Sequence, residues 1–121
     1  MPIVEIEIVL KPNEIIQSET VEELADQLGE IFGSPQGTTW IKIYGLAQDH
    51  YAENDETPAG VFPVFVSILK SKLPAIQELQ MEVESITGAV AQICGRPSEY
   101  VHVIYLPDGK GRQAFGGKIV T

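Results

Sequence analysis

Pro2 is the residue whose type and position could do chemistry. A small residue after the initiator methionine is the usual signal for removal of that methionine, so we expect the mature chain to begin with proline. Its ring nitrogen would then be a secondary amine. Terminal amines have pKa values of about 7.7 to 8.0, and apolar surroundings would lower the pKa into the range that suits a general base. With Met1 retained, the same nitrogen is an amide and has no basicity.

Other chemistry-bearing residues have simpler interpretations. Cys94, the only cysteine, falls in an apolar helical pattern and is interpreted as a small core residue. His50 lies in an acidic segment, where one histidine among carboxylates makes no convincing metal site. The sequence GKGR at 109–112 lacks the spacing of a phosphate-binding loop, and no helical pattern follows it. We therefore expect neither a metal site nor a phosphate-binding loop.

Charge and composition exclude several classes of partner. The 121 residues carry a formal charge of −9, whereas nucleic acids and anionic membranes bind basic surfaces. The apolar runs are short and strand-like, which predicts neither a signal peptide nor a membrane span. A lone cysteine also provides no disulfide framework. With 44% hydrophobic residues, the chain is expected to be one globular domain, 1–121, located in the cytoplasm.

The first third of the chain has a β-α-β pattern. Residues 3–9 alternate between apolar and acidic side chains, which predicts a half-buried strand. A helix is predicted to begin near Ser18 to Thr20, where Thr20 and Glu23 have the spacing of a capping box. Gly33 marks the end of this helix. Residues 39–46 are rich in aromatic and β-branched types, which is typical of a second strand.

The same order repeats after a polar, acidic connector at 47–60, which has Pro58 near its end. A strand is predicted at 62–69, a helix at 74–94 and a strand at 100–106. The glycine-x-proline motif that ends the first helix recurs after the second. We interpret this as an internal duplication of a β-α-β unit. The predicted repeats cover about 2–46 and 62–106, and a glycine-rich C-terminal hairpin follows them.

Two such units predict an α/β fold. Each unit needs a right-handed crossover between parallel strands, and together they form a four-stranded sheet with both helices on one face. The other face of such a sheet must also be covered. We expect Val4, Ile6, Val64 and Val66 to make that second face apolar, which favours self-association.

The segments MPIVEIEIV and GRPSEYVHVIYLPDGKGRQAFGG give the chain a family resemblance. With its duplicated unit, it resembles the longer members of the tautomerase superfamily, of the 4-oxalocrotonate tautomerase and macrophage migration inhibitory factor type. The resemblance implies a homotrimer with Pro2 in a pocket between subunits. It also implies a cofactor-free keto-enol tautomerase of a small 2-oxo or 2-hydroxy carboxylic acid, with Pro2 as general base.

The resemblance also implies which side chains would hold the acid. Lys70 and Lys72 follow the first strand of the second unit, where the family usually has arginine, although lysine does not replace arginine's two-pronged hydrogen bonding. Arg96 matches a basic residue of the inhibitory-factor branch, and Ser34 takes that place in the first unit. Lys42 and His102 are further candidates, because we interpret them as matching positions on the second strand of each unit. Arg112 in the terminal hairpin is another. Gln113 falls near the place where many members of the family have a pocket aromatic, and Phe115 would take that role instead.

Two alternatives stay open. A protonated Pro2 would be an acid for hydration, dehalogenation or decarboxylation, reactions that also require a carboxylate or histidine to activate water. A trimeric binding module without turnover is the other alternative, and both lysine in place of arginine and a retained Met1 would favour it.

Overall fold

The computed structural model describes residues 1–54 and 59–121, so Pro58 of the connector lies outside the described residues. The helices and strands follow the predicted β-α-β-β-α-β order, with a short hairpin at the end. In chain order they are β1 (Ile3–Val9), α1 (Ser18–Phe32), β2 (Trp40–Leu46), β3 (Val64–Leu69), α2 (Ile76–Cys94), β4 (Val101–Tyr105), β5 (Ala114–Phe115) and β6 (Lys118–Ile119).

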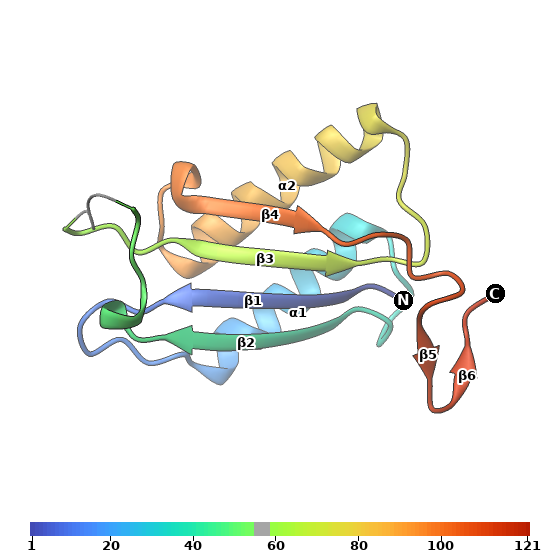
Figure 1. Ribbon diagram of the computed structural model, residues 1–121, viewed down its shortest axis with the longest axis horizontal. Coiled ribbons are helices and arrows are strands. Elements are labelled where there is room, and N and C mark those ends of the chain that lie inside the picture. The colour runs from blue at the N-terminus through green and yellow to red at the C-terminus, as the bar shows by residue number, and fades with distance from the viewer. Residues whose placement is uncertain (55–58) are drawn as a thin grey trace.

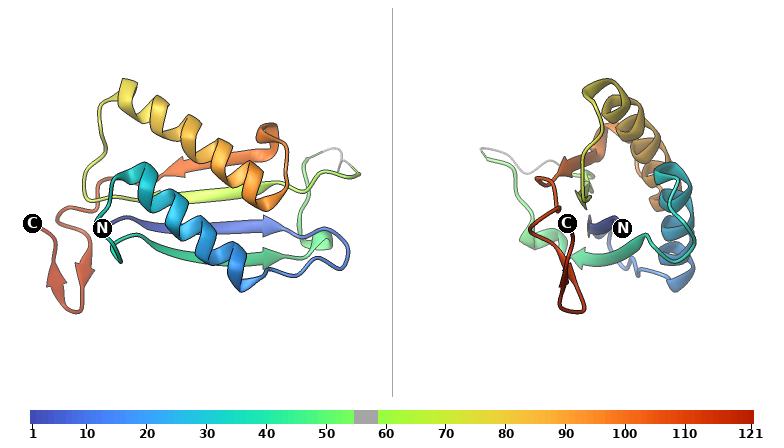
Figure 2. Two further views of the ribbon diagram at one scale, coloured as in Figure 1. Left: turned by 180° about the vertical axis from the view of Figure 1, so that it is seen from behind. Right: turned by 90° about the vertical axis from the view of Figure 1, so that its right-hand side faces the viewer.

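The four long strands form one mixed sheet in the order β2-β1-β3-β4. Parallel pairs join β1 to β2 and β3 to β4, while β1 and β3 run antiparallel at the centre. Both helices lie on the same side of this sheet, as the views from the front and from behind show (Figures 1 and 2). The predicted architecture of two β-α-β units is therefore confirmed.

Each helix packs through residues that recur at helical spacing. Leu24 and Leu28 of α1 and Ile86 and Val90 of α2 are fully buried against the sheet. Each helix ends on a glycine in the left-handed region, which an L-residue with a Cβ avoids: Gly33 has φ 63° and Gly95 has φ 67°.

Helix α1 begins at Ser18, within the predicted range of Ser18 to Thr20, and has Gln17 as its N-cap. The predicted capping box was wrong, because Thr20 is already helical and no side-chain cap is found at this helix start. Helix α2 begins at Ile76 rather than at residue 74, because Ala75 is still extended, with ψ 155°.

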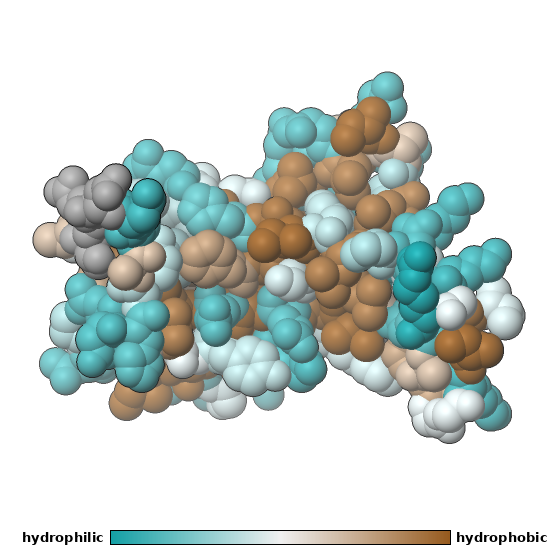
Figure 3. All heavy atoms as spheres, viewed as in Figure 1, coloured by the Kyte–Doolittle hydropathy of each residue, from teal (hydrophilic) through white to brown (hydrophobic). Residues whose placement is uncertain are grey.

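The prediction for the second face of the sheet was also wrong. Val4, Ile6, Val64 and Val66 are fully buried in the core beneath the helices. Because side chains alternate along a strand, the opposite face carries the residues between them. This open face, which Figure 3 shows as apolar patches among polar ones, consists of three rows across the strands: Trp40, Ile3 and Leu69; Lys42, Glu5, Ser67 and Ile104; and Tyr44, Glu7, Phe65 and His102.

Candidate functional site

Pro2 is buried at the start of central strand β1, while Met1 before it is 41% exposed. The Pro2 carbonyl accepts a hydrogen bond of 3.1 Å from the backbone N–H of Trp40. Ile3 lies opposite Leu69, so the start of β1 adjoins the end of β3 and the segment 70–72 that follows it. The C-terminal hairpin lies at this same end of the sheet (Figure 1).

Lys70 lies at this end but is already paired. Its Nζ atom is 2.8 Å from Oε1 of Glu82 on α2 and 5.1 Å from the centre of the Phe32 ring. Glu82 accepts a second hydrogen bond of 2.7 Å from the Tyr105 hydroxyl. Burial and the neighbouring carboxylate raise the pKa of Tyr105 above its ordinary value. The Lys70 and Glu82 side chains are only 18% and 12% exposed, so the positive charge of Lys70 is balanced by a largely buried carboxylate on α2.

The predicted residues Lys72, Arg112 and Phe115 are also at this end of the fold. Lys72 is exposed in the segment that follows β3. Arg112 is exposed in the terminal hairpin, where its Nη1 donates a 2.9 Å hydrogen bond to the carbonyl of Asp108. The Phe115 ring packs edge-on against Trp40 with 5.2 Å between ring centres. Within one chain, these residues share the Pro2 end of the sheet.

A pocket of about 400 Å³ opens beside this end. One of its residues, Gln113, is only 6% exposed, yet neither its Oε1 nor its Nε2 has a hydrogen-bond partner in the described part of the chain. Pro2 is not among the lining residues. The walls combine apolar and polar groups, including Leu69, Leu106, Pro107, Asp108, Arg112 and Gln113.

Lys42 and His102 lie elsewhere on the open face. Lys42 forms an exposed 2.8 Å ion pair with Glu5, and this hydrogen bond raises the pKa of Lys42. His102 stacks on Phe65, with 5.5 Å between ring centres, at the opposite end of β3 from Lys70. The register places Ile104 rather than His102 in the row of Lys42, so the interpretation of the two as matching positions was wrong.

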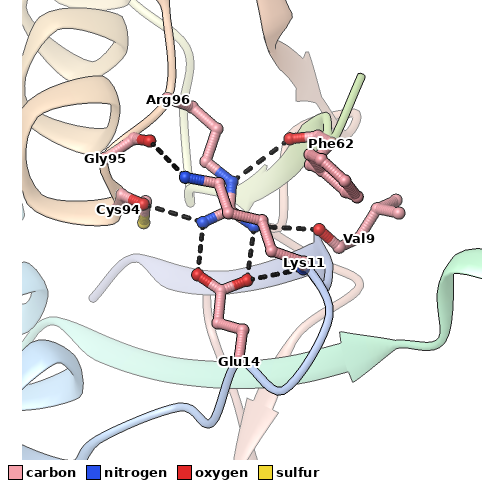
Figure 4. Close-up of polar contacts among 7 residues, drawn as sticks. All are labelled: Val9, Lys11, Glu14, Phe62, Cys94, Gly95 and Arg96. Atoms are coloured by element: carbon pink, nitrogen blue, oxygen red, sulfur yellow. Dashed lines mark hydrogen bonds and ion pairs between the residues drawn. The ribbon is translucent and has the colours of Figure 1, made fainter. Parts of the chain in front are cut away.

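Arg96 is buried and serves the architecture. Its guanidinium donates two hydrogen bonds of 2.6 Å to the Glu14 carboxylate (Figure 4). It also donates to three backbone carbonyls, those of Val9, Phe62 and Cys94, at 2.8–3.2 Å. These bonds join the loop after β1, the start of β3 and the end of α2. The sequence carried no signal for the partner, because Glu14 lies 82 residues earlier in the chain.

The described residues hold no group of three or more histidine, cysteine, aspartate or glutamate side chains arranged to bind a metal ion. Among the helices of the described part of the chain, none has the length and apolar character needed to cross a membrane.

Several solved structures share this fold along nearly the whole chain. Pt0534 inactivated by 2-oxo-3-pentynoate superposes with a TM-score of 0.77 and 16% identity, covering 98% of this chain and 94% of that one. A fused 4-OT symmetric trimer has a TM-score of 0.80, 13% identity and coverages of 98% and 94%. A macrophage migration inhibitory factor homologue from Prochlorococcus marinus has a TM-score of 0.75 and 14% identity, and the match covers 98% of this chain and 99% of that one. No family model matches the sequence, and the search of curated proteins finds no match.

The class of fold follows from these comparisons. The mixed four-stranded sheet with two helices on one face is the tautomerase fold, as the resemblance in the sequence implied. Because the identities lie between 13% and 16%, the likeness defines the fold and leaves the substrate to be argued from this chain's own residues.

Proposed function

We propose that this protein is a cofactor-free keto-enol tautomerase of a small 2-oxo or 2-hydroxy carboxylic acid, with Pro2 as general base. The supporting observation is the burial of Pro2 directly before the central strand β1. An amine buried there after removal of Met1 would be partly withdrawn from water, and desolvation lowers the pKa of an amine. The reaction moves one proton between an oxygen and a carbon of the substrate, and such an amine can accept and return it.

A structural neighbour supports the substrate class. Pt0534, which shares the fold over 98% of this chain, is inactivated by 2-oxo-3-pentynoate. That reagent is a 2-oxo acid. By analogy, we propose that the end of the sheet at Pro2 accepts an acid of the same class.

Lys72 and Arg112 are the proposed groups for the substrate carboxylate. Both are cationic and exposed at the Pro2 end of the sheet. Lys70 is a weaker candidate because Glu82 already compensates its charge. Lys42 and His102 would need a neighbouring subunit to reach such a site. Phe115, packed on Trp40, would supply an apolar wall.

A homotrimer is part of the proposal. The open face of the sheet carries exposed apolar residues, among them Trp40 and Ile104, at 45% and 53% exposure. Apolar surface of this kind favours association. A 4-OT neighbour that shares the fold is a symmetric trimer. We also propose a cytoplasmic location, because Cys94 is the one cysteine of the sequence and offers no disulfide of the kind that secreted domains rely on.

The decisive experiment compares two forms of the same sequence, separated and verified by intact mass. One form begins at Pro2 and the other retains Met1. We expect the first to catalyse ketonisation of a dienol acid, followed by ultraviolet absorbance, and the second to be inactive because its Pro2 nitrogen is an amide. The substitution Pro2→Ala should also lower the rate, because it removes the proposed base, and Pro12→Ala, at an exposed turn, is its matched control. Equal rates for the two mass-verified forms would exclude Pro2 as the base.

One set of contacts favours a second candidate, a binding module without turnover. Three predicted or family-matched cations are already paired with carboxylates: Lys42 with Glu5, Lys70 with Glu82, and Arg96 with Glu14. A module of this kind would bind the acid and return it unchanged. Native protein that retains Met1 and binds a dienol acid without converting it would select this candidate over the enzyme.

A further inference from the structure

The ion pair of Lys70 with Glu82 lies beside Pro2. In the antiparallel register of β1 with β3, Val4 is opposite Ile68. Two residues further toward the start of β1, the same register places Pro2 opposite Lys70, and opposed residues of this kind have Cα atoms about 5 Å apart. Side chains two residues apart on a strand share a face, and Val4 and Ile68 are fully buried beneath the helices. Pro2 and Lys70 therefore face the helices as well.

The contacts of Lys70 agree with this placement. Its Nζ atom donates a 2.8 Å hydrogen bond to Glu82 on α2 and lies 5.1 Å from the centre of the Phe32 ring at the end of α1. Glu82 in turn accepts a 2.7 Å hydrogen bond from the Tyr105 hydroxyl on β4. Figure 2 shows the end of α1 and the start of α2 at the same end of the sheet as the N-terminus. The ion pair is thus held from two helices and a strand, close to the place of a terminal amine at Pro2.

The charges of this pair are poorly screened by water, because the two side chains are only 18% and 12% exposed. A nearby cation opposes protonation of an amine, and a nearby carboxylate favours it. Tyr105 adds no charge near neutral pH, since its pKa is raised above its ordinary value. The other charged groups on the surrounding elements are exposed, so water and salt screen them. They are Glu5, Lys42, Lys72, Glu78, Asp108, Lys110 and Arg112.

We propose that Glu82 is a positioning residue for the Pro2 amine: it holds Lys70 in place, balances the charge of that lysine and so keeps the amine basic enough to accept a proton. Desolvation alone already lowers the pKa of a buried amine. An unbalanced Lys70 would lower it further, below the range that suits a general base. In this role neither Lys70 nor Glu82 contacts the substrate. The role rests on the proposed function, because the amine exists only after removal of Met1.

The test follows protonation of the Pro2 amine directly, in the full chain and without substrate. Protein labelled with nitrogen-15 proline, and shown by intact mass to lack Met1, is titrated with acid and base in an NMR experiment. The Pro2 signal is distinct because every other proline nitrogen is an amide. Glu82→Gln keeps an oxygen for the Tyr105 hydroxyl and leaves Lys70 unbalanced, so it should lower the pKa of the Pro2 amine, with roughly three- to tenfold weaker proton binding. Lys70→Met leaves the carboxylate unbalanced and should raise this pKa by a similar factor.

Two more variants separate charge from structure. Lys70→Met combined with Glu82→Gln removes both charges and should return the pKa of the Pro2 amine close to that of the wild type. The matched control is Glu84→Gln, also on α2, where the exposed carboxylate accepts a 3.0 Å hydrogen bond from Gln80. This change should leave the pKa of the Pro2 amine unaltered, because water screens the charge of Glu84.

An unchanged pKa of the Pro2 amine in Glu82→Gln and Lys70→Met would overturn the proposal. Shifts in the same direction in these two variants would overturn it as well, since a loosened structure and not the charge would then be their cause. Either single variant tests the sign of the effect if the other does not fold. Opposite shifts in a protein that converts no dienol acid would support the role of Glu82 and count against the proposed tautomerase.

Discussion

The ion pair between Glu14 and Arg96 should be a main source of stability in this fold. The substitution Glu14→Gln keeps the size of the side chain and removes its charge. In the wild-type protein the Glu14 carboxylate accepts two 2.6 Å hydrogen bonds from a guanidinium whose side chain is only 2% exposed. The substitution leaves that buried cation with three backbone carbonyls and no opposite charge.

The expected loss follows from the contacts. Hydrogen bonds to charged groups contribute about 1.5–3 kcal/mol each, and removing one partner of a buried pair costs about 3–5 kcal/mol. Glu14 is 27% exposed, so water compensates part of the loss. We therefore expect Glu14→Gln to lower the free energy of unfolding by about 2 kcal/mol. Arg96→Met, which also leaves three carbonyls unpaired, should cost about 3–5 kcal/mol.

The effect should depend on pH. The hydrogen bonds from Arg96 lower the pKa of Glu14 below its ordinary value. The folded protein therefore binds the Glu14 proton less tightly than the unfolded chain does. The contribution is complete above the unfolded glutamate pKa of about 4.3 and is lost as the pH falls through the lower folded value. The difference between wild type and Glu14→Gln should be constant near neutral pH and should shrink in acid.

Urea unfolding followed by circular dichroism measures these differences at each pH. The matched control is Glu5→Gln, which breaks the exposed pair with Lys42, where both side chains are about half exposed. That change should leave the unfolding midpoint unaltered, because exposed pairs contribute little. If Glu14→Gln and Glu5→Gln unfolded at the same urea concentration, or if the gap stayed constant in acid, our account of Arg96 would be refuted.

Three further substitutions should change stability. Gln113→Met should raise the free energy of unfolding by about 1 kcal/mol, because it removes a buried carboxamide that lacks a partner. Thermal unfolding measures this change. A decrease of similar size in the free energy of unfolding would show that the carboxamide is paired. Gly88→Ala, inside α2 with nothing within 4 Å of the new Cβ, should stabilise by about 0.5–1 kcal/mol. Gly95→Ala should destabilise by about 1 kcal/mol because its φ is 67°. Equal midpoints for the two glycine variants would contradict the role of φ.

The sequence was sufficient for the elements and their order. Alternation in 3–9 and helical spacing of Leu24 and Leu28 are local patterns, and they indicated the observed strand and helix. The duplication then limited the topology, because parallel strands joined through a helix take a right-handed crossover. The caps of the two helices were predicted less well, because Gln17 and Ala75 cap without a recognisable side-chain motif.

Which face of the sheet the valines occupy depended on tertiary packing. Alternation shows that Val4 and Ile6 share a face but not which face the helices cover. The relative position of Lys42 and His102 also depended on tertiary packing, because the pairing of β1 with β3 sets the strand register that separates them.

By itself, the sequence determined the β-α-β duplication, the position of Pro2 at the start of a strand and the candidate cations. Only the tertiary structure decided that Lys70 and Arg96 are bound to carboxylates and that Gln113 is buried without a partner. The physical reason is that these partnerships join residues distant in the chain, such as Glu14 and Arg96. Local periodicity has no information about which side chains the folded sheet and helices bring within hydrogen-bonding distance.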